Sequence, residues 1–136
     1  MKTGSCLCGA VKYEVHGALR PVIVCHCGQC RKQTGSFMHA TASADKDFKL
    51  AASRSLKWFR ASASAARGFC AECGSVLFWK GDGLNYISIT AGSIDGATGL
   101  EIEGHIYCAD AGDYYEITGG DYQLQQWEAK TPPSSP

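Results

Sequence analysis

The amino-acid sequence predicts a mainly β fold in a single domain. Short segments alternate apolar and polar side chains with the period of two that half-buried strands show, and glycine, aspartate and serine separate them. No segment of ordinary helix length combines a helical period with cap residues; residues 45–52 are the one rival, and that segment is short. With 136 residues, 45% of them hydrophobic, the chain can form one core, which excludes a multidomain machine.

The individual strands follow from these patterns in chain order. Residues 9–15 alternate valine and tyrosine with lysine and glutamate, and residues 21–24 form a short apolar run that leads into a cysteine cluster. Residues 31–34, ahead of Gly35, predict one helical turn at most. Further strand-like runs lie at residues 37–44, 55–62, 75–79, 84–91 and, less regularly, 102–108.

Eight cysteines carry most of the chemical information. The N-terminus lacks the apolar segment of a secretory signal, which predicts a cytoplasmic protein whose reduced thiols bind metal rather than form disulfides. Seven of the cysteines fall into tight clusters, and C-x-C or C-x-x-C spacing on a turn directs two sulfurs at one ion. The clusters are Cys6 with Cys8, Cys25 with Cys27 and Cys30, and Cys70 with Cys73.

Seven sulfurs divide into four and three. A closed structural zinc takes four ligands, whereas a catalytic zinc takes three from the protein and leaves one position open. This division joins Cys6, Cys8, Cys70 and Cys73 in a zinc-ribbon-like four-cysteine site and leaves Cys25, Cys27 and Cys30 as an open triplet. Other divisions pair two thiols of the triplet with Cys70 and Cys73, and an iron–sulfur centre is the minor rival to zinc.

The histidines and the eighth cysteine leave further options. His39 or His105 could add a nitrogen to the triplet and make it a structural site, whereas His26, between two ligands, should point away from the metal. Cys108 is interpreted as a small buried side chain without a ligand or nucleophile role. Aromatic residues within or beside strand-like runs are interpreted mainly as core: Trp58, Phe59, Phe78, Trp79, Tyr86, Tyr114 and Tyr115.

Charge and hydropathy exclude several classes of partner. Thirteen basic and thirteen acidic residues cancel, and no basic block is present, so nucleic acid is not an expected partner. No apolar run approaches the roughly 18 to 20 residues of a membrane span, so no membrane association is expected. We predict a single zinc-binding domain at residues 1–128 and a disordered tail at residues 129–136, where proline and serine offer nothing to bury.

Three ordered motifs carry a resemblance to a known family. The cysteine-containing segments at residues 4–14, 25–35 and 67–75 are similar in order and spacing to the glutathione-dependent formaldehyde-activating enzyme family, which includes centromere protein V. The resemblance implies a β-tent fold of several coiled antiparallel sheets, shared with a Rab guanine-nucleotide exchange factor. It also implies two zinc ions: a structural zinc in the four-cysteine site, and an exchangeable catalytic zinc in the triplet whose occupancy stays open.

The same resemblance implies an activity. The family's founding reaction adds glutathione to formaldehyde to give S-hydroxymethylglutathione, which makes the expected protein a zinc-dependent carbon–sulfur lyase in formaldehyde detoxification. Its small-molecule substrates would be glutathione or another small thiol, together with an aldehyde. Residues 112–117 are similar to the family's aromatic C-terminal motif, with Asp-Tyr where Pro-Trp is usual. The alternative is a non-catalytic zinc-binding protein-interaction module, or a thiol or zinc sensor.

Overall fold

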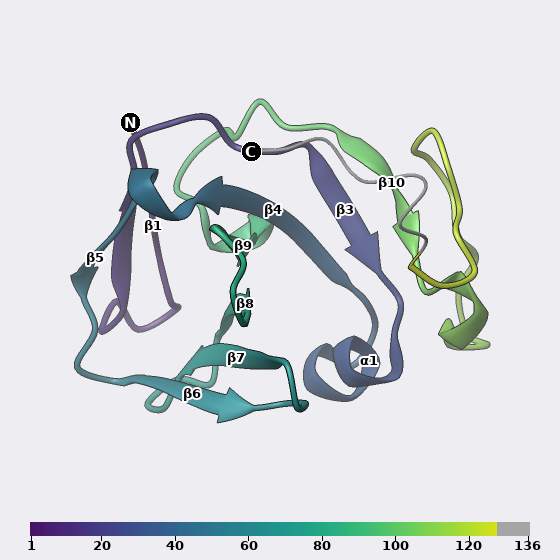
Figure 1. Cartoon of the computed structure of the whole chain (residues 1–136), viewed down its shortest axis with the longest axis horizontal. Helices are drawn as coiled ribbons and strands as arrows, with labels where there is room; N and C mark the ends of the chain where they lie inside the picture. The colour runs from purple at the N-terminus through teal and green to yellow at the C-terminus, as the bar shows by residue number, and fades with distance from the viewer. Residues whose placement is uncertain (128–136) are drawn as a thin grey trace.

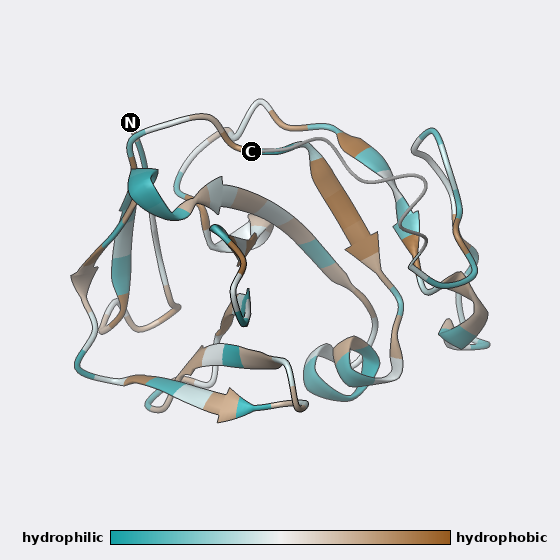
Figure 2. Ribbon diagram, in the orientation of Figure 1, coloured by the Kyte–Doolittle hydropathy of each residue, from teal (hydrophilic) through white to brown (hydrophobic). Residues whose placement is uncertain are grey.

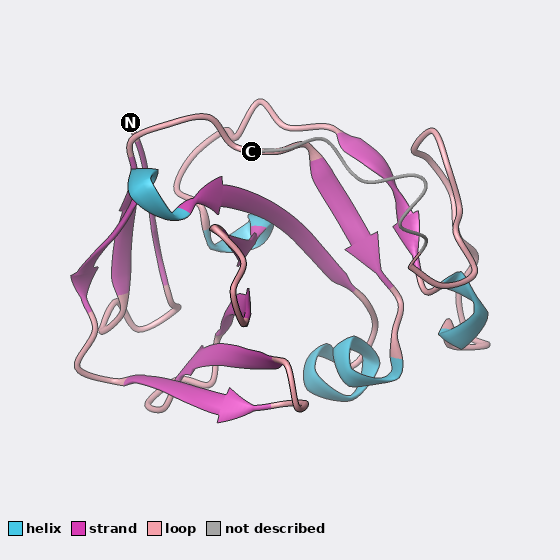
Figure 3. Cartoon of the chain, in the orientation of Figure 1, coloured by secondary structure: helices cyan, strands magenta, loops and turns pink. Residues whose placement is uncertain are grey.

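The computed structural model describes residues 1–127 and confirms the mainly β prediction (Figure 3). The strands are β1 (Lys2–Ser5), β2 (Lys12–Val15), β3 (Val22–Cys25), β4 (Met38–Ala44), β5 (Phe48–Ala52), β6 (Leu56–Arg60), β7 (Ala65–Cys70), β8 (Val76–Gly81), β9 (Tyr86–Thr90) and β10 (Ile102–Ile106). The helices are α1 (Gly28–Thr34) and the 3-10 turns η1 (Asp45–Asp47), η2 (Ala91–Ser93) and η3 (Cys108–Asp110). No helix within residues 1–127 has the length and apolar character that crossing a membrane requires.

The strands form two sheets. One sheet has the order β1-β2-β5, and the other has the order β10-β3-β4-β9-β8-β7-β6. In Figure 1 the larger sheet curves from β10 and β3 over β4 towards β6 and β7, and α1 lies on the open side of the curve. All pairs of named strands are antiparallel except β10 with β3, which run parallel with Ile106 opposite Cys25. The larger sheet is therefore mixed, since the long connection from β9 allows β10 to return in the same direction as β3.

The main core lies between the two sheets. The rings of Tyr13, Phe48 and Phe78 pack together with centroids 5.3 to 5.6 Å apart, within the range for favourable aromatic pairs. The Tyr13 hydroxyl lies 2.7 Å from Ser93 Oγ, so its polar end is satisfied. A Cβ on Gly4 would overlap the Tyr13 ring, so this β1 position requires glycine for the close approach of the two strands.

The structure corrects several element boundaries. The segment at residues 45–52, the one rival for a helix, contains η1 followed by β5, which pairs with β2. Strands β1 and β7 were not predicted, because neither shows a clear alternation. Helix α1 starts at Gly28 and has seven residues, rather than the single turn expected at residues 31–34. The predicted tail at residues 129–136 lies outside the described residues, and the domain boundary stays a prediction.

The larger sheet uses its two faces differently. Ile87, Ile89 and Phe78 point into the core between the sheets. The residues that alternate with them, such as Ser88 and Trp79, line a cavity on the opposite face, and these two are cross-strand partners. Strand β3 is apolar along its length (Figure 2), and the side chains of Val22, Ile23 and Val24 are all buried. The fold thus places a hydrophobic core on one face and a cavity on the other.

Candidate metal centres and their cavity

The four-cysteine site is assembled in the structure. The Sγ atoms of Cys6, Cys8, Cys70 and Cys73 all lie within 4.8 Å of one another. Two of these separations are 3.6 Å, between Cys6 and Cys8, and 3.7 Å, between Cys8 and Cys70. A tetrahedral zinc with Zn–S bonds of about 2.3 Å places its sulfurs about 3.8 Å apart. The donor set and its spacing therefore fit a tetrahedral ion.

Two glycine-terminated turns bring these sulfurs together. Gly9 and Gly74 have φ values of 80° and 76°, the left-handed region that glycine adopts without penalty. Ser75 links the two turns, because its Oγ accepts a hydrogen bond from the Leu7 backbone N–H at 2.9 Å and lies 3.2 Å from Cys73 Sγ. The hydrogen bond to Ser75 is also the first cause that lowers the pKa of Cys73, to about 5. Ser75 thus connects the two turns and favours the thiolate form of Cys73.

The triplet forms a second cluster at the junction of β3 and α1. The Sγ atoms of Cys25, Cys27 and Cys30 lie within 4.8 Å of one another, and no histidine among residues 1–127 joins them. Cys27 is the N-cap of α1, and its Sγ accepts a hydrogen bond from the Cys30 backbone N–H at 3.3 Å. Hydrogen bonds from Cys25 and then Cys30 hold the pKa of Cys27 far below its usual range. The triplet offers three sulfurs and therefore fits an ion with one position left for another ligand.

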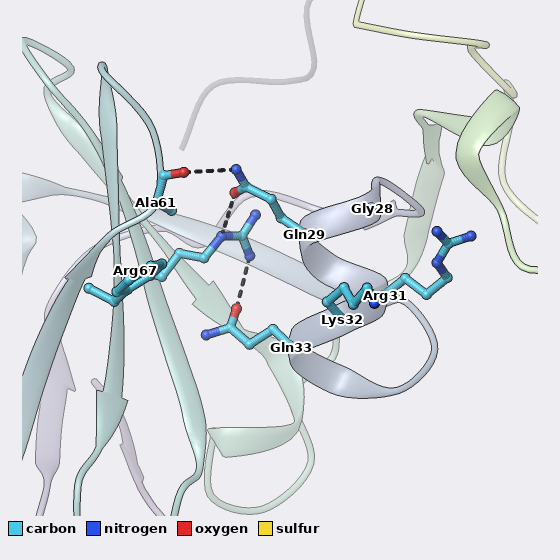
Figure 4. A pocket seen from close by; sticks show the side chains of 8 residues that line it. Gly28, Gln29, Arg31, Lys32, Gln33, Ala61 and Arg67 are labelled. Carbon is cyan, nitrogen blue, oxygen red and sulfur yellow. Dashed lines mark hydrogen bonds between the residues drawn. The ribbon is translucent and has the colours of Figure 1, made fainter.

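A buried arginine lies against the triplet. Arg67 on β7 is only 6% exposed, and both of its terminal nitrogens lie 3.6 Å from Cys30 Sγ. Its guanidinium also donates to Gln29 Oε1 and Gln33 Oε1, each at 3.0 Å, so two side chains of α1 fix its position (Figure 4). No ion pair between described residues includes Arg67. If the three sulfurs bound one divalent ion as thiolates, one negative charge would remain, and the guanidinium lies where it would balance that charge.

The triplet opens onto a cavity of about 760 Å³. Its floor is the concave face of the larger sheet, contributed by Ile23, Cys25, Met38, Ala40, Arg67, Trp79, Tyr86 and Ser88. Tyr107 on the wall follows Ile106, the partner of Cys25 in the sheet, and has a φ of 54°, which is uncommon for a residue other than glycine. Burial and then the charges of Cys25 and Cys27 raise the pKa of the Tyr107 phenol. A protonated hydroxyl is thus available near the sulfurs.

A chain of hydrogen bonds fixes the backbone between Cys25 and Cys27. His105 Nε2 lies 3.0 Å from the Thr118 carbonyl oxygen and must donate to it, so in the neutral ring its Nδ1 accepts from His26 Nε2 at 2.9 Å. His26 Nδ1 then accepts from the Tyr115 hydroxyl at 2.8 Å. Burial, then the neighbouring rings of His105 and His39, lowers the pKa of His26 to about 4. The histidine pair therefore ties the triplet to the segment after β10.

The family model described as glutathione-dependent formaldehyde-activating enzyme matches residues 1–110, which contain both cysteine clusters. The chain belongs to this family. The resemblance carried by the three cysteine motifs is thereby confirmed, and membership in the formaldehyde-activating family implies an enzyme of the carbon–sulfur lyase kind.

Solved structures support the same fold. The crystal structure of a protein from Rhodobacter sphaeroides aligns with a TM-score of 0.60 at 22% sequence identity, covering 74% of this chain and 97% of that one. This likeness shows a shared fold. A search of curated proteins finds no match.

The structure also shows where the histidines considered as alternative metal ligands lie. His105 uses both ring nitrogens in the hydrogen-bond chain, and His39 is exposed on the opposite face of β4 from Met38. Neither completes the triplet, and His26 points away from the sulfurs as expected. Of the aromatic residues interpreted as core, Phe78 is buried, but Trp79 and Tyr86 line the cavity and Phe59 is exposed.

Cys108 lies outside both cysteine clusters of this formaldehyde-activating family member. It begins η3, and its backbone N–H donates to the Leu124 carbonyl at 2.9 Å. Cys108→Ala should therefore leave the metal content per chain unchanged in atomic emission measurements. The loss of about one ion per chain would show instead that its thiol is a ligand.

Sequence reasoning missed three residues that the structure brings to the cavity: Arg20, Arg67 and Tyr107. Arg67 does lie in one of the segments similar to the formaldehyde-activating family, but no pattern in the sequence linked it to the triplet. A buried arginine is uncommon without a charged partner, so the signal appears only when burial and neighbours are known.

Proposed function

We propose that the protein is a zinc-dependent carbon–sulfur lyase that forms or breaks a thiol–aldehyde adduct such as S-hydroxymethylglutathione. The observation that carries this proposal is the three-sulfur triplet opening onto a 760 Å³ cavity. A four-sulfur site elsewhere in the chain supports a division between a structural and a catalytic zinc. The family description supplies glutathione and formaldehyde as the first substrates to test.

The reaction joins the sulfur of a thiol to the carbonyl carbon of an aldehyde, and the thiol proton ends on the former carbonyl oxygen. Zinc held by Cys25, Cys27 and Cys30 would supply Lewis-acid chemistry, which favours the thiolate form of a thiol at neutral pH. Arg67 balances the excess thiolate charge of the cluster. The Tyr107 phenol, protonated at neutral pH, donates a hydrogen bond to the oxygen of the adduct. The reverse sequence breaks the same carbon–sulfur bond.

The proposal is tested by exchange spectroscopy at equilibrium, because thiol addition to formaldehyde also proceeds without a catalyst. Zinc-loaded protein should exchange glutathione and its formaldehyde adduct faster than buffer alone. Cys27→Ser should reduce the rate to background while the chain remains folded, since α1 and the four-cysteine site persist. Cys108→Ser is the matched control and should keep the parent rate.

Two outcomes would contradict the lyase proposal. One is a parent protein that exchanges no thiol–aldehyde pair above background; the other is a Cys27→Ser variant as active as the parent. Either would favour the non-catalytic zinc-binding module or sensor. Metal analysis of the same samples would also separate zinc from iron at the two clusters.

A further inference from the structure

Arg20 is a second buried cation in the cavity, and the proposed mechanism does not use it. It lies just before β3, is 6% exposed, and lines the cavity together with the triplet. Its backbone is fixed on both sides: its N–H donates to the Ala42 carbonyl at 3.0 Å, and its carbonyl accepts from Thr41 Oγ1 at 2.5 Å. The position of its side chain is therefore set by β4.

The guanidinium of Arg20 has more N–H groups than its two carbonyl acceptors use. Nη2 donates to the Ala40 carbonyl at 3.1 Å and Nε to the Pro21 carbonyl at 3.4 Å, both neutral acceptors. Arg20 also lines the cavity, so its guanidinium borders the space that a substrate would occupy. A guanidinium carries five N–H groups, more than these two carbonyl oxygens use.

The ion pairs His16–Glu14, Arg54–Glu72, Arg60–Asp82 and Lys80–Asp45 between described residues do not include Arg20. Glu103 is the acidic residue within electrostatic range, and its Oε2 accepts from the Tyr122 hydroxyl at 2.9 Å. Tyr86 and Tyr122 also act electrostatically on the guanidinium. A buried arginine without a directly paired anion is uncommon, since the cost of burying its charge is only partly offset by neutral acceptors.

The register places Arg20 at a useful distance from the triplet. Its Nη2 contacts the carbonyl of Ala40, which pairs with Ile23, and two residues along the same strands Met38 pairs with Cys25. Two residues of a strand span about 7 Å between backbone positions. A molecule with sulfur at the triplet and an anion a few bonds away can therefore reach both groups.

We propose that Arg20 binds the carboxylate of the substrate, so that the cavity selects thiols or aldehydes with a carboxylate a few bonds from the reacting atom. The sulfur end of this assignment rests on the proposed function, whereas the carboxylate end rests on Arg20 itself. Trp79, Leu84 and Tyr86 line the same cavity and give the carbon chain of the substrate an apolar surface. Arg67 is already engaged with sulfurs and glutamines, which leaves Arg20 for the anion.

The test is calorimetric titration of zinc-loaded protein with 3-mercaptopropionate and its neutral match, 3-mercapto-1-propanol. The acid should bind at least about 10-fold more tightly, the size expected for a charge-assisted hydrogen bond. Arg20→Gln should remove this preference by weakening the acid about 10- to 100-fold and leaving the alcohol nearly unchanged. Arg20→Lys should keep part of the preference, because it retains the charge but not the planar fork. Arg60→Gln, at an exposed arginine paired with Asp82, is the matched control and should bind as the parent does.

A second series tests whether the carboxylate belongs to the aldehyde. Glyoxylate is compared with glycolaldehyde in the same titration; a preference confined to one series assigns the carboxylate to the thiol or to the aldehyde. Equal binding of acid and neutral match in both series would overturn the assignment of Arg20. So would an Arg20→Gln variant that weakens acid and alcohol alike, which would indicate a structural role.

Binding and turnover separate this proposal from the lyase proposal. Tighter binding of the acids without accelerated exchange would support carboxylate binding by Arg20 and contradict the lyase activity. Accelerated exchange without tighter binding of the acids would support the lyase activity and contradict carboxylate binding by Arg20. If Arg20→Gln loses its bound metal or its fold, the parent and Arg20→Lys still give the ratio of acid to alcohol affinity, and that ratio decides the outcome.

Discussion

Cys70→Ser should prevent the chain from reaching its native fold. Cys70 is fully buried, ends β7, and contributes one of the four sulfurs that join this strand to the turn after β1. Structural zinc binding contributes on the order of 10 to 16 kcal/mol in small domains, whereas a domain's whole unfolding free energy is about 5 to 15 kcal/mol. Losing one ligand should therefore remove a stabilisation comparable to the whole unfolding free energy of the domain. Calorimetry should show no cooperative transition.

Cys27→Ser is the matched comparison, because it removes one sulfur from the triplet and leaves the four-cysteine site complete. It should retain a cooperative transition near that of the parent. Cys108→Ser, which touches neither cluster, controls for the substitution itself. Equal melting temperatures for the Cys70→Ser and Cys27→Ser variants would contradict the division into a structural and a catalytic site.

Arg67→Met should weaken metal binding at the triplet by about 100-fold or more. The substitution keeps the length and apolar stem of the side chain but removes the positive charge 3.6 Å from Cys30 Sγ. Breaking a buried ion pair costs about 3 to 5 kcal/mol, because the partner's charge is left without compensation. Competition with a chromophoric chelator measures the affinity of each site. The affinity of the four-cysteine site should not change.

Arg60→Met controls for the loss of an arginine, since Arg60 pairs with Asp82 at the surface. Arg67→Lys should recover only part of the affinity, because an ammonium cannot contact both glutamines and the sulfurs with a planar fork. If Arg67→Met binds metal at the triplet as tightly as the parent, the arginine does not balance the thiolate charge.

The sequence was most informative where the pattern was local. The apolar alternation near β9, the apolar run that forms β3 and the spacing of the cysteines each depend on neighbours in the chain, and each appears in the structure. Strand β5 was obscured because Lys49, Leu50 and Ala51 suit a helix equally well, and only pairing with β2 decides between the two. Strand β7 was missed because Ala65, Ala66 and Gly68 lack the branched or aromatic side chains typical of strands.

The cavity residues show a different limit of sequence reasoning. Arg20, Arg67 and Tyr107 come from distant parts of the chain, and only the order of strands in the larger sheet brings them beside the triplet. Arg20 and Arg67 stand out because they are buried, and Tyr107 stands out because its φ is positive. Neither property has a signature in a single sequence without its neighbours in space. By contrast, the motif around the triplet was visible because its three ligands lie within six residues.

The division of the larger sheet into a core face and a cavity face constrains how this protein can evolve. Ile87 and Ile89 alternate with Tyr86 and Ser88 along one strand, so inserting a single residue in β9 would exchange the two sets and place polar groups in the core. New specificities should therefore arise by substitution at positions such as Ser88 or by paired insertions, which restore the alternation. Relatives with altered substrates should keep the lengths of these strands equal or change them by even numbers.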